Sequence, residues 1–314
     1  MISLYPAIEP YQTDTLQCGD HQIYFEVSGN PEGIPVIFLH GGPGSGCKPY
    51  HRSFFDPSRY KIILVDQRGS GRSLPSGFCQ GNTTSDLIRD LESIRMALGL
   101  NTWILFGGSW GATLALLYAE SYPERVLGLI LRGVFLARKT DLDWFVGPCG
   151  VRKIYPESWN LLLADLPEED HAYPIPKLHQ ILMAQDELAQ RRAARAWDIW
   201  GGQVVLGDLF DPVHLDAHGS HASVCQARIE LHYAVHNYFI EENQILSHIH
   251  RIPKVPIHII HGRRDLVCPL EAAWTLHQAI PGSRLEILPN GGHIASTDDM
   301  VDALVRATDA MAAE

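Results

Sequence analysis

Residues 107–111 read Gly-Gly-Ser-Trp-Gly, so that Ser109 has a glycine two residues to either side. The segment follows a short apolar run that is typical of a buried strand, and it precedes an Ala- and Leu-rich run that is typical of a helix. A serine at a sharp strand-to-helix turn exposes its hydroxyl, and Gly107 and Gly111 would let strand and helix pack closely. The free N–H groups at the start of the helix would point at the reacting atoms. The pattern therefore predicts a nucleophile at Ser109.

A serine hydroxyl needs a base to take its proton, and two residues later in the chain fit the remaining roles. Asp265 and His293 each lie just beyond a strand-like run, as Ser109 does. We predict that His293 is the base and that Asp265 orients its ring and stabilises the imidazolium. Asp66 also follows a strand-like run and is the alternative acid. It precedes the nucleophile, however, whereas sheets that carry this turn use the order serine, acid, histidine.

Acyl transfer passes through an oxyanion that backbone donors must stabilise. One donor would be the N–H of Trp110, directly after the nucleophile. The other would come from the loop His40-Gly41-Gly42, with Gly42 favoured because glycine lets the backbone approach a substrate closely. The histidine pairs at 248/250 and 258/261 lack further ligands at metal-binding spacing, so we expect neither a metal nor a cofactor.

Composition narrows the class of protein. The chain has 314 residues and a net charge of −11, which argues against a nucleic-acid partner. No apolar run approaches the roughly 18–20 residues that span a bilayer, so we expect no membrane partner. Six scattered cysteines without a C-x-x-C pair favour free thiols, and we therefore expect a cytoplasmic protein. The sequence does not predict an oligomeric state.

Strand-like and helical runs alternate, which predicts an α/β fold with a mostly parallel sheet and helices on both faces. Strands are expected at 21–28, 35–39, 60–65, 103–106, 126–131, 255–261 and 284–288, and helices at 84–98, 112–119, 270–279 and 298–311. Strand-like runs nearly disappear between 138 and 245, where helical stretches lie at 178–200 and 223–239. We predict a catalytic domain of residues 1–137 and 246–314 with a helical cap, 138–245, inserted into it.

Several motifs together resemble the proline iminopeptidases, or prolyl aminopeptidases, of the α/β-hydrolase superfamily. They occur in the family's order and spacing: His40-Gly41-Gly42-Pro43-Gly44, Asp66-Gln67-Arg68-Gly69, Gly107-Gly108-Ser109-Trp110-Gly111, Leu131-Arg132-Gly133, Gly262-Arg263-x-Asp265 with Cys268-Pro269, and Gly292-His293. The resemblance implies a triad of Ser109, Asp265 and His293. It also implies that a small peptide substrate loses its N-terminal proline through an acyl-enzyme, while the cap holds the free amine.

The cap departs from the family pattern. The glutamate that binds the substrate amine in the family, after Trp-x-x-Trp, is Gly201 here, whereas the second amine-binding glutamate is present as Glu230. A phenylalanine of the proline pocket is replaced by Ala234, while Phe135 and Phe145 match other aromatic positions of that pocket. Losing one amine contact would cost about ten- to a hundredfold in kcat/KM, so activity would be weakened rather than abolished.

These departures from the family pattern suggest roles for two charged residues. Asp198 lies three residues before Gly201, on the same face of a continuous helix, and we hypothesise that it takes part of the missing glutamate's role. Arg132 can pair with that glutamate in the family, and without it Arg132 would be free to meet a substrate carboxylate or another acid.

Three functions therefore stand in order of preference. The first is a serine aminopeptidase of the proline iminopeptidase type, favoured by Glu230. The second is an esterase or amidase with the same triad and a different substrate choice, toward which Gly201 and Ala234 point. The third is a non-catalytic small-molecule binder on the same fold, which the complete set of triad residues disfavours.

Overall fold

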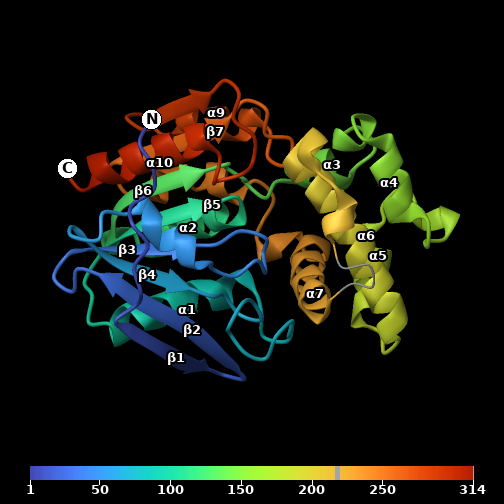
Figure 1. The fold of residues 1–314 in the computed structure, drawn as a ribbon, viewed down its shortest axis with the longest axis horizontal. Coiled ribbons are helices and arrows are strands. Elements are labelled where there is room, and N and C mark those ends of the chain that lie inside the picture. Colours follow the sequence, from blue (N-terminus) through green and yellow to red (C-terminus); the bar gives the residue numbers. More distant parts are fainter. Residues whose placement is uncertain (216–219, 314) are drawn as a thin grey trace.

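The computed structural model describes residues 1–215 and 220–313; residues 216–219, inside the expected cap, and residue 314 lie outside the described part. A sheet of eight strands, in the order β1-β2-β4-β3-β5-β6-β7-β8, forms its centre (Figure 1). The strands are β1 (Gln12–Cys18), β2 (His21–Gly29), β3 (Ile34–Leu39), β4 (Tyr60–Val65), β5 (Trp103–Gly108), β6 (Val126–Arg132), β7 (Ile257–Gly262) and β8 (Arg284–Leu288). From β4 to β8 all neighbours are parallel, which confirms the expected α/β fold.

The first strand was not expected from the sequence. β1 pairs antiparallel with β2, which in turn pairs antiparallel with β4. Most of its side chains are polar and exposed, as suits an edge strand with water on both faces. Such a strand shows no alternation of apolar residues, so periodicity cannot detect it.

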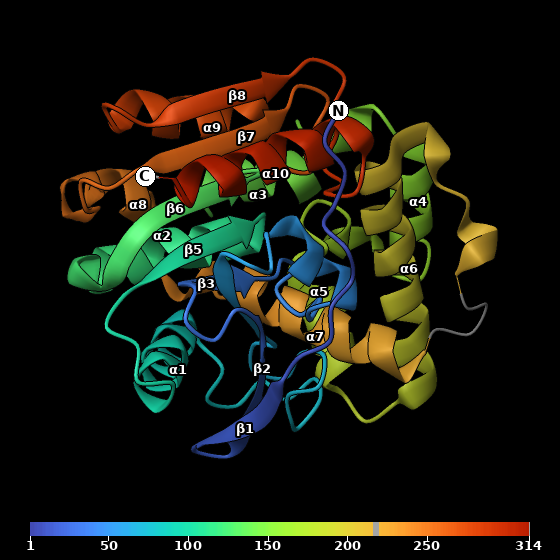
Figure 2. The same ribbon diagram turned by 60° about the vertical axis from the view of Figure 1, so that its left-hand side comes forward.

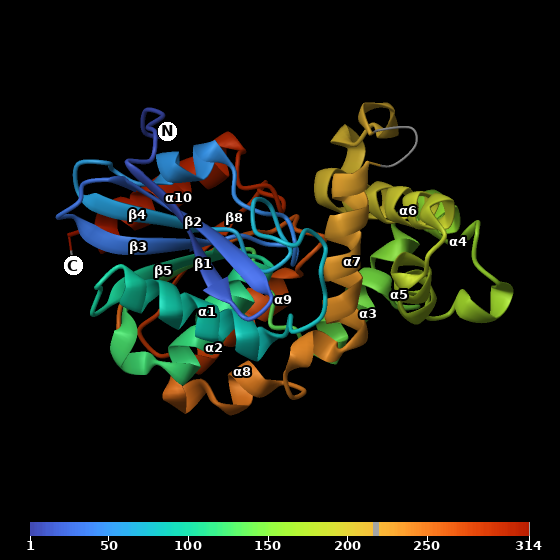
Figure 3. The same ribbon diagram turned by 90° about the horizontal axis from the view of Figure 1, so that it is seen from below.

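Helices cover both faces of the sheet, as Figure 2 and Figure 3 show. On one face α1 (Thr84–Ala97), α2 (Trp110–Ser121), α8 (Gln244–Ser247) and α9 (Leu270–Ala279) contribute to a large apolar core. On the other face α10 (Asp298–Met311) and the 3-10 helix η1 (Pro49–Phe54) pack over a second core. Because both faces are covered, β5 and β7 are buried along their whole length, and β4 is buried except at Lys61.

The inserted segment is helical, with α3 (Lys139–Val146), α4 (Pro156–Leu163), α5 (Ile175–Met183), α6 (Glu187–Leu206) and α7 (His221–Val235). The expectation of one helical stretch over 178–200 is wrong, because the chain breaks between α5 and α6. Asp186 begins α6 there, and its carboxylate accepts the N–H groups of Leu188 and Ala189, each at 3.0 Å. An N-cap of this kind starts a new helix.

The cap has an apolar core of its own, which includes Trp159 and Trp200. Helix α7 contributes side chains to this core and lies on the side of the cap that faces the sheet domain (Figure 3). Tyr238 and Ile245, after α7, already pack in the core of the sheet. The cap therefore contacts the sheet domain along α7. The chain has returned to the core of the sheet domain by Tyr238, before residue 246. Throughout the described ranges, every helix is too short or too polar to cross a bilayer.

Candidate active site

Ser109 occupies the sharp turn between β5 and α2. Its backbone has φ 56° and ψ −125°, a conformation that L residues rarely adopt. The two flanking glycines are needed, because a Cβ on Gly107 would lie 2.2 Å from the carbonyl oxygen of Gly111, and one on Gly111 would lie 2.0 Å from that of Leu39. Because glycine has no side chain at either position, the strand and the helix can approach closely enough to present the serine.

Asp265 and His293 form a close pair beyond the ends of β7 and β8. Asp265 Oδ2 lies 2.7 Å from His293 Nδ1, and Oδ1 accepts the backbone N–H groups of Val267 and Cys268 at 3.0 and 2.9 Å. Burial alone would raise the pKa of Asp265, but His293 and these donors hold that pKa below its usual value. The carboxylate is therefore ionised and placed to fix the orientation of the imidazole.

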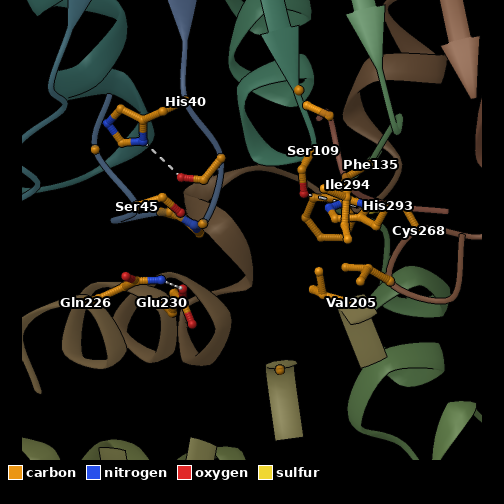
Figure 4. A pocket seen from close by; sticks show the side chains of 18 of the residues that line it. His40, Ser45, Ser109, Phe135, Val205, Gln226, Glu230, Cys268, His293 and Ile294 are labelled. Carbon is orange, nitrogen blue, oxygen red and sulfur yellow. Dashed lines mark hydrogen bonds between the residues drawn. The ribbon is translucent and has the colours of Figure 1, made fainter. Parts of the chain in front are cut away.

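Ser109 and His293 line the same cavity and lie beside each other in Figure 4. Among the described residues, the serine Oγ has Cys268 Sγ as its side-chain neighbour at 3.9 Å, and no hydrogen bond joins it to the imidazole. Catalytic hydrogen bonds are often long before a substrate binds. The proton transfer that we predict for this pair therefore requires the two side chains to come within hydrogen-bond distance.

The predicted oxyanion donors lie next to Ser109. A Cβ on Gly41 would lie 3.3 Å from Ser109 Cβ, so the loop that carries Gly42 packs against the serine. Gly42 has φ 108°, which favours glycine. The N–H of Trp110 is at the first turn of α2, where no intrahelical acceptor is available to it. Both N–H groups thus remain predicted donors for an oxyanion.

A buried chain of hydrogen bonds ties this loop to the serine turn. The N–H of Gln67 donates to His40 Nε2 at 3.0 Å, so the neutral ring carries its proton on Nδ1, which donates to the Gly41 carbonyl at 2.9 Å. Gln67 Oε1 then accepts the indole N–H of Trp110 at 2.9 Å. The backbone on both sides of the site is therefore held in one position before a substrate arrives.

Asp66, the alternative acid, forms its side-chain hydrogen bonds with Arg72 and Cys47. Its carboxylate accepts Nε of Arg72 at 2.7 Å and the backbone N–H groups of Cys47 and Arg72 at 2.7 and 2.9 Å. It is fully buried in this arrangement, and its partners do not include His293. Asp66 therefore fixes the loops after β3 and β4, and the geometry favours Asp265 as the partner of the histidine.

A cavity of about 660 Å³ opens above Ser109 between the sheet and the cap. Glu230 of α7 lies on its cap side, where the carboxylate accepts the indole N–H of Trp197 and, at 2.8 Å, the side-chain N–H of Gln226 (Figure 4). Burial raises the pKa of Glu230 to about 7, and the nearby carboxylate of Asp198 contributes in the same direction. In the described part of the chain this carboxylate has no cation beside it.

Asp198 also lines the cavity, one turn of α6 before Gly201. Burial raises the pKa of Asp198, while a hydrogen bond with Ser223 opposes the rise. A Cβ at Gly201 would meet nothing within 4 Å, so the position of the missing glutamate is open space. Ala234 contributes another small side chain to the wall. The structure thus brings the two acids together and leaves room beside them.

The two aromatic residues predicted for the pocket line it as well. Phe135 packs edge-on against Tyr238, with ring centroids 5.0 Å apart, and Phe145 packs edge-on against Trp197 at 5.8 Å. Edge-to-face contacts of this kind fix ring positions. An apolar side chain of a substrate would therefore find a rigid aromatic wall.

Arg132 lies at the end of β6, on the sheet side of the cavity. Its Nη1 donates to the backbone carbonyl of His293, and its guanidinium packs against Gly108. Within residues 1–215 and 220–313 it forms no ion pair. Burial lowers the pKa of Arg132, and the charge of Asp265, which lies beyond ion-pair distance, opposes that change. That Arg132 meets a substrate carboxylate or another acid stays a prediction.

Comparisons with known proteins identify the family. A model of the alpha/beta hydrolase fold matches residues 34–299. A proline iminopeptidase of Xanthomonas citri is 45% identical over 99% of this chain and 100% of its own length. Another, from Arabidopsis thaliana, is 41% identical over 99% of this chain and 82% of its own length. The chain belongs to the proline iminopeptidase family.

Solved structures agree on the fold. A proline iminopeptidase-related protein of Thermus thermophilus superposes with a TM-score of 0.61 at 22% identity, covering 98% of this chain and 99% of its own. An esterase of Exiguobacterium antarcticum gives a TM-score of 0.60 at 23% identity, with 96% and 100% covered. Likeness at this identity shows the α/β-hydrolase fold alone.

Two members of the site had no role in the sequence analysis. Cys268 lines the cavity beside Ser109 and caps the Asp265 carboxylate with its N–H. His261, buried at the end of β7, accepts the N–H of Val134 on Nδ1 at 3.1 Å and so donates from Nε2 to the Cys268 carbonyl at 2.8 Å. His261 thereby holds the loop that carries the acid. Its only sequence signal was a histidine at the end of a predicted strand.

No metal site adds to this arrangement in the described ranges, where no three or more His, Cys, Asp or Glu side chains are grouped to hold an ion.

Proposed function

We propose that this member of the family is a serine aminopeptidase that releases the N-terminal residue, preferentially proline, from small peptides through an acyl-enzyme. The observation that carries the proposal is the pair of acids, Glu230 and Asp198, facing the cavity above Ser109 with no cation beside them among the described residues. A carboxylate pair in this setting is complementary to the charged amine of a peptide's first residue.

The proposed mechanism gives each group of the site one role. Ser109 Oγ attacks the carbonyl carbon of the first residue while His293 takes the hydroxyl proton, and Asp265 stabilises the imidazolium. The oxyanion accepts hydrogen bonds from the N–H groups of Gly42 and Trp110. His293 then gives the proton to the leaving nitrogen as the C–N bond breaks. Water, activated by the same histidine, hydrolyses the ester to release the free amino acid.

A prolyl arylamide tests the reaction. We expect release of the arylamine by the wild type, and a loss on the order of a millionfold in kcat for Ser109→Ala. A fluorophosphonate probe should label the wild type and leave Ser109→Ala unlabelled. Absence of both turnover and labelling would favour the non-catalytic binder.

The amine subsite is tested by blocking the amine. N-acetylation of the prolyl arylamide should lower kcat/KM by about ten- to a hundredfold, because it removes a charged hydrogen bond to the acid pair. Glu230→Gln should lower turnover of the free-amine substrate by a similar factor and leave the acetylated substrate nearly unaffected. Asp198→Asn tests its share separately, and an unchanged KM for the free-amine substrate would show that Asp198 takes no part.

An esterase or amidase is the second candidate, because Gly201 leaves the amine side of the cavity without one acid and Ala234 leaves its wall open. A simple aryl ester without an amine decides between them. Faster turnover of that ester than of any aminoacyl ester would favour the esterase. For the cellular setting we propose the cytoplasm, which the six unpaired cysteines support, since a reducing compartment keeps thiols free.

A further inference from the structure

The sheet side of the cavity carries two cations. Arg132 at the end of β6 and Lys48 in the loop after β3 both line it. In the described part of the chain neither side chain forms an ion pair. The cap side of the same cavity carries Glu230 and Asp198, also without cations. The cavity is therefore acidic on one side and basic on the other, with Ser109 at its floor.

The guanidinium of Arg132 lies one residue from the nucleophile. A Cβ on Gly108 would be 2.5 Å from Nη2, so the guanidinium rests against the residue that precedes Ser109. Only Nη1 has an acceptor among the described residues, the carbonyl of His293. Nε and Nη2 remain as donors in the fixed fork that binds carboxylates in bidentate fashion.

Among the described residues, the other charged groups near Arg132 and Lys48 do not form ion pairs with these two cations. Of the nearby acids, Asp66 is paired with Arg72 and Asp265 with His293. His51 is near both cations and stays neutral, since burial above all, followed by His40, Lys48 and Arg132, lowers its pKa to about 3. Tyr50 and Cys268, which also neighbour Arg132, keep their protons because burial raises the pKa of each. The carboxylate of Asp265 acts on Arg132 from beyond ion-pair distance and is held by His293, so Arg132 and Lys48 are the cations of this part of the cavity wall.

We propose that Arg132, assisted by Lys48, binds the free carboxylate of the residue that leaves, so that the preferred substrates are dipeptides. The proposal rests on the aminopeptidase function proposed above. In a dipeptide the carboxylate follows the scissile carbonyl by one residue, a step of about 3.8 Å between Cα atoms. The guanidinium, which packs against Gly108, lines the same cavity as Ser109. The acids of the cap would then hold the amine of the substrate while the cations of the sheet hold its other end.

The reaction itself is unchanged. The peptide C–N bond breaks, the leaving nitrogen takes the proton from His293, and water completes the hydrolysis to two free amino acids. A carboxylate bound by Arg132 would orient the leaving residue as this proton is delivered. A longer peptide or an amide has no charge at that place and loses the contact.

Three substrates that share the residues Pro-Leu test the proposal: Pro-Leu, Pro-Leu-amide and Pro-Leu-Gly. Released proline is the readout. We expect kcat/KM for Pro-Leu to exceed that for Pro-Leu-amide by about ten- to a hundredfold, the effect of one hydrogen-bonded ion pair. Arg132→Gln should bring the ratio close to one, and Arg132→Lys should restore part of it. Lys48→Gln should reduce the ratio less, and Lys153→Gln, an exposed lysine of the cap, should leave it unchanged.

The ratio separates this role from support of the triad. If Arg132 only holds the His293 backbone, Arg132→Gln will slow all three substrates equally and leave the ratio as in the wild type, which overturns the proposal. Binding to Ser109→Ala by calorimetry gives a readout without turnover, where Pro-Leu should bind at least tenfold more tightly than its amide. Equal binding overturns the carboxylate subsite alone. No hydrolysis of any prolyl substrate overturns the aminopeptidase function and the subsite together.

Discussion

Glu230 and Asp198 are two carboxyl groups that share one side of a cavity, and their proximity decides how the site responds to pH. Burial first, and then the charge of Asp198, raise the pKa of Glu230 to about 7 in the absence of a ligand. Only the ionised carboxylate attracts a substrate ammonium. The ionised fraction falls as the pH falls through 7, so binding of a free amine weakens in the same range.

This predicts a pH dependence that is specific to the amine. We expect kcat/KM for prolyl arylamide, divided by that for its N-acetylated form, to rise with an apparent pKa near 7. The division removes any effect of pH on the triad, which serves both substrates equally. In Glu230→Gln the ratio should be low and independent of pH between 5.5 and 8. A wild-type ratio that does not change over this interval would remove Glu230 from amine binding.

A second residue-scale prediction concerns His261, which acts through the loop that holds the acid. His261→Leu would leave the N–H of Val134 and the carbonyl of Cys268 without partners, and we expect a loss of about 1–3 kcal/mol of stability. His261→Gln can replace one of the two bonds and should lose less. Thermal unfolding of the two variants measures the difference, and equal midpoints for wild type and leucine variant would contradict the role.

Residue types pointed to the candidate reacting groups in this chain more readily than to the groups that support them. Ser109, Asp265 and His293 were predicted because each follows a strand-like run in a recognisable order. Gln67 and His261 were not, because a buried hydrogen bond between distant residues leaves no pattern in the sequence. The same limit applies to Arg132, where the sequence could suggest a missing partner but not its contact with His293.

At the scale of elements, the turn between β5 and α2 forms because the strand and the helix approach each other closely, although the backbone of the turn itself is strained. The serine conformation is strained, and the surrounding glycines allow it only because a strand and a helix meet there without side chains. Apolar periodicity predicted this strand and helix well. It did not predict β1, which is polar, or the break before α6, which a single aspartate cap specifies.

Replacing Gly111 or Gly201 by alanine should change the free energy of unfolding in opposite directions. Gly111→Ala places Cβ 2.0 Å from the Leu39 carbonyl oxygen, and we expect a loss of about 3 kcal/mol or more from the resulting clash. Gly201→Ala, within α6 and with nothing within 4 Å of the new Cβ, should gain about 0.5–1 kcal/mol from helix propensity. Urea unfolding of both proteins provides the comparison. A stable Gly111→Ala would show that the turn can move apart.

At the scale of the whole molecule, we propose that specificity is set where the cap meets the sheet. The sheet domain supplies Ser109, His293 and the cations, whereas α6 and α7 supply the acids and the wall that we propose surrounds the first residue of a substrate. Small residues at Gly201 and Ala234 leave that wall open within a cavity of about 660 Å³. We therefore expect the wild type to accept leucyl and phenylalanyl arylamides beside the prolyl compound.

Ala234→Phe should narrow the selectivity of the cap without touching the reacting groups. Ala234 is 5% exposed and its side chain faces the cavity wall, so the larger ring would occupy space that a bulky first residue needs. A change of this size in an apolar pocket alters discrimination by about 1–3 kcal/mol, and the prolyl-to-leucyl ratio of kcat/KM should rise by about tenfold or more. Ala164→Phe, on the exposed surface of the cap, is the matched control and should leave the ratio as it is. If the ratio is the same in both variants, the first residue of the substrate does not bind against α7, and the wall must be sought among Phe135, Phe145 and the end of α6.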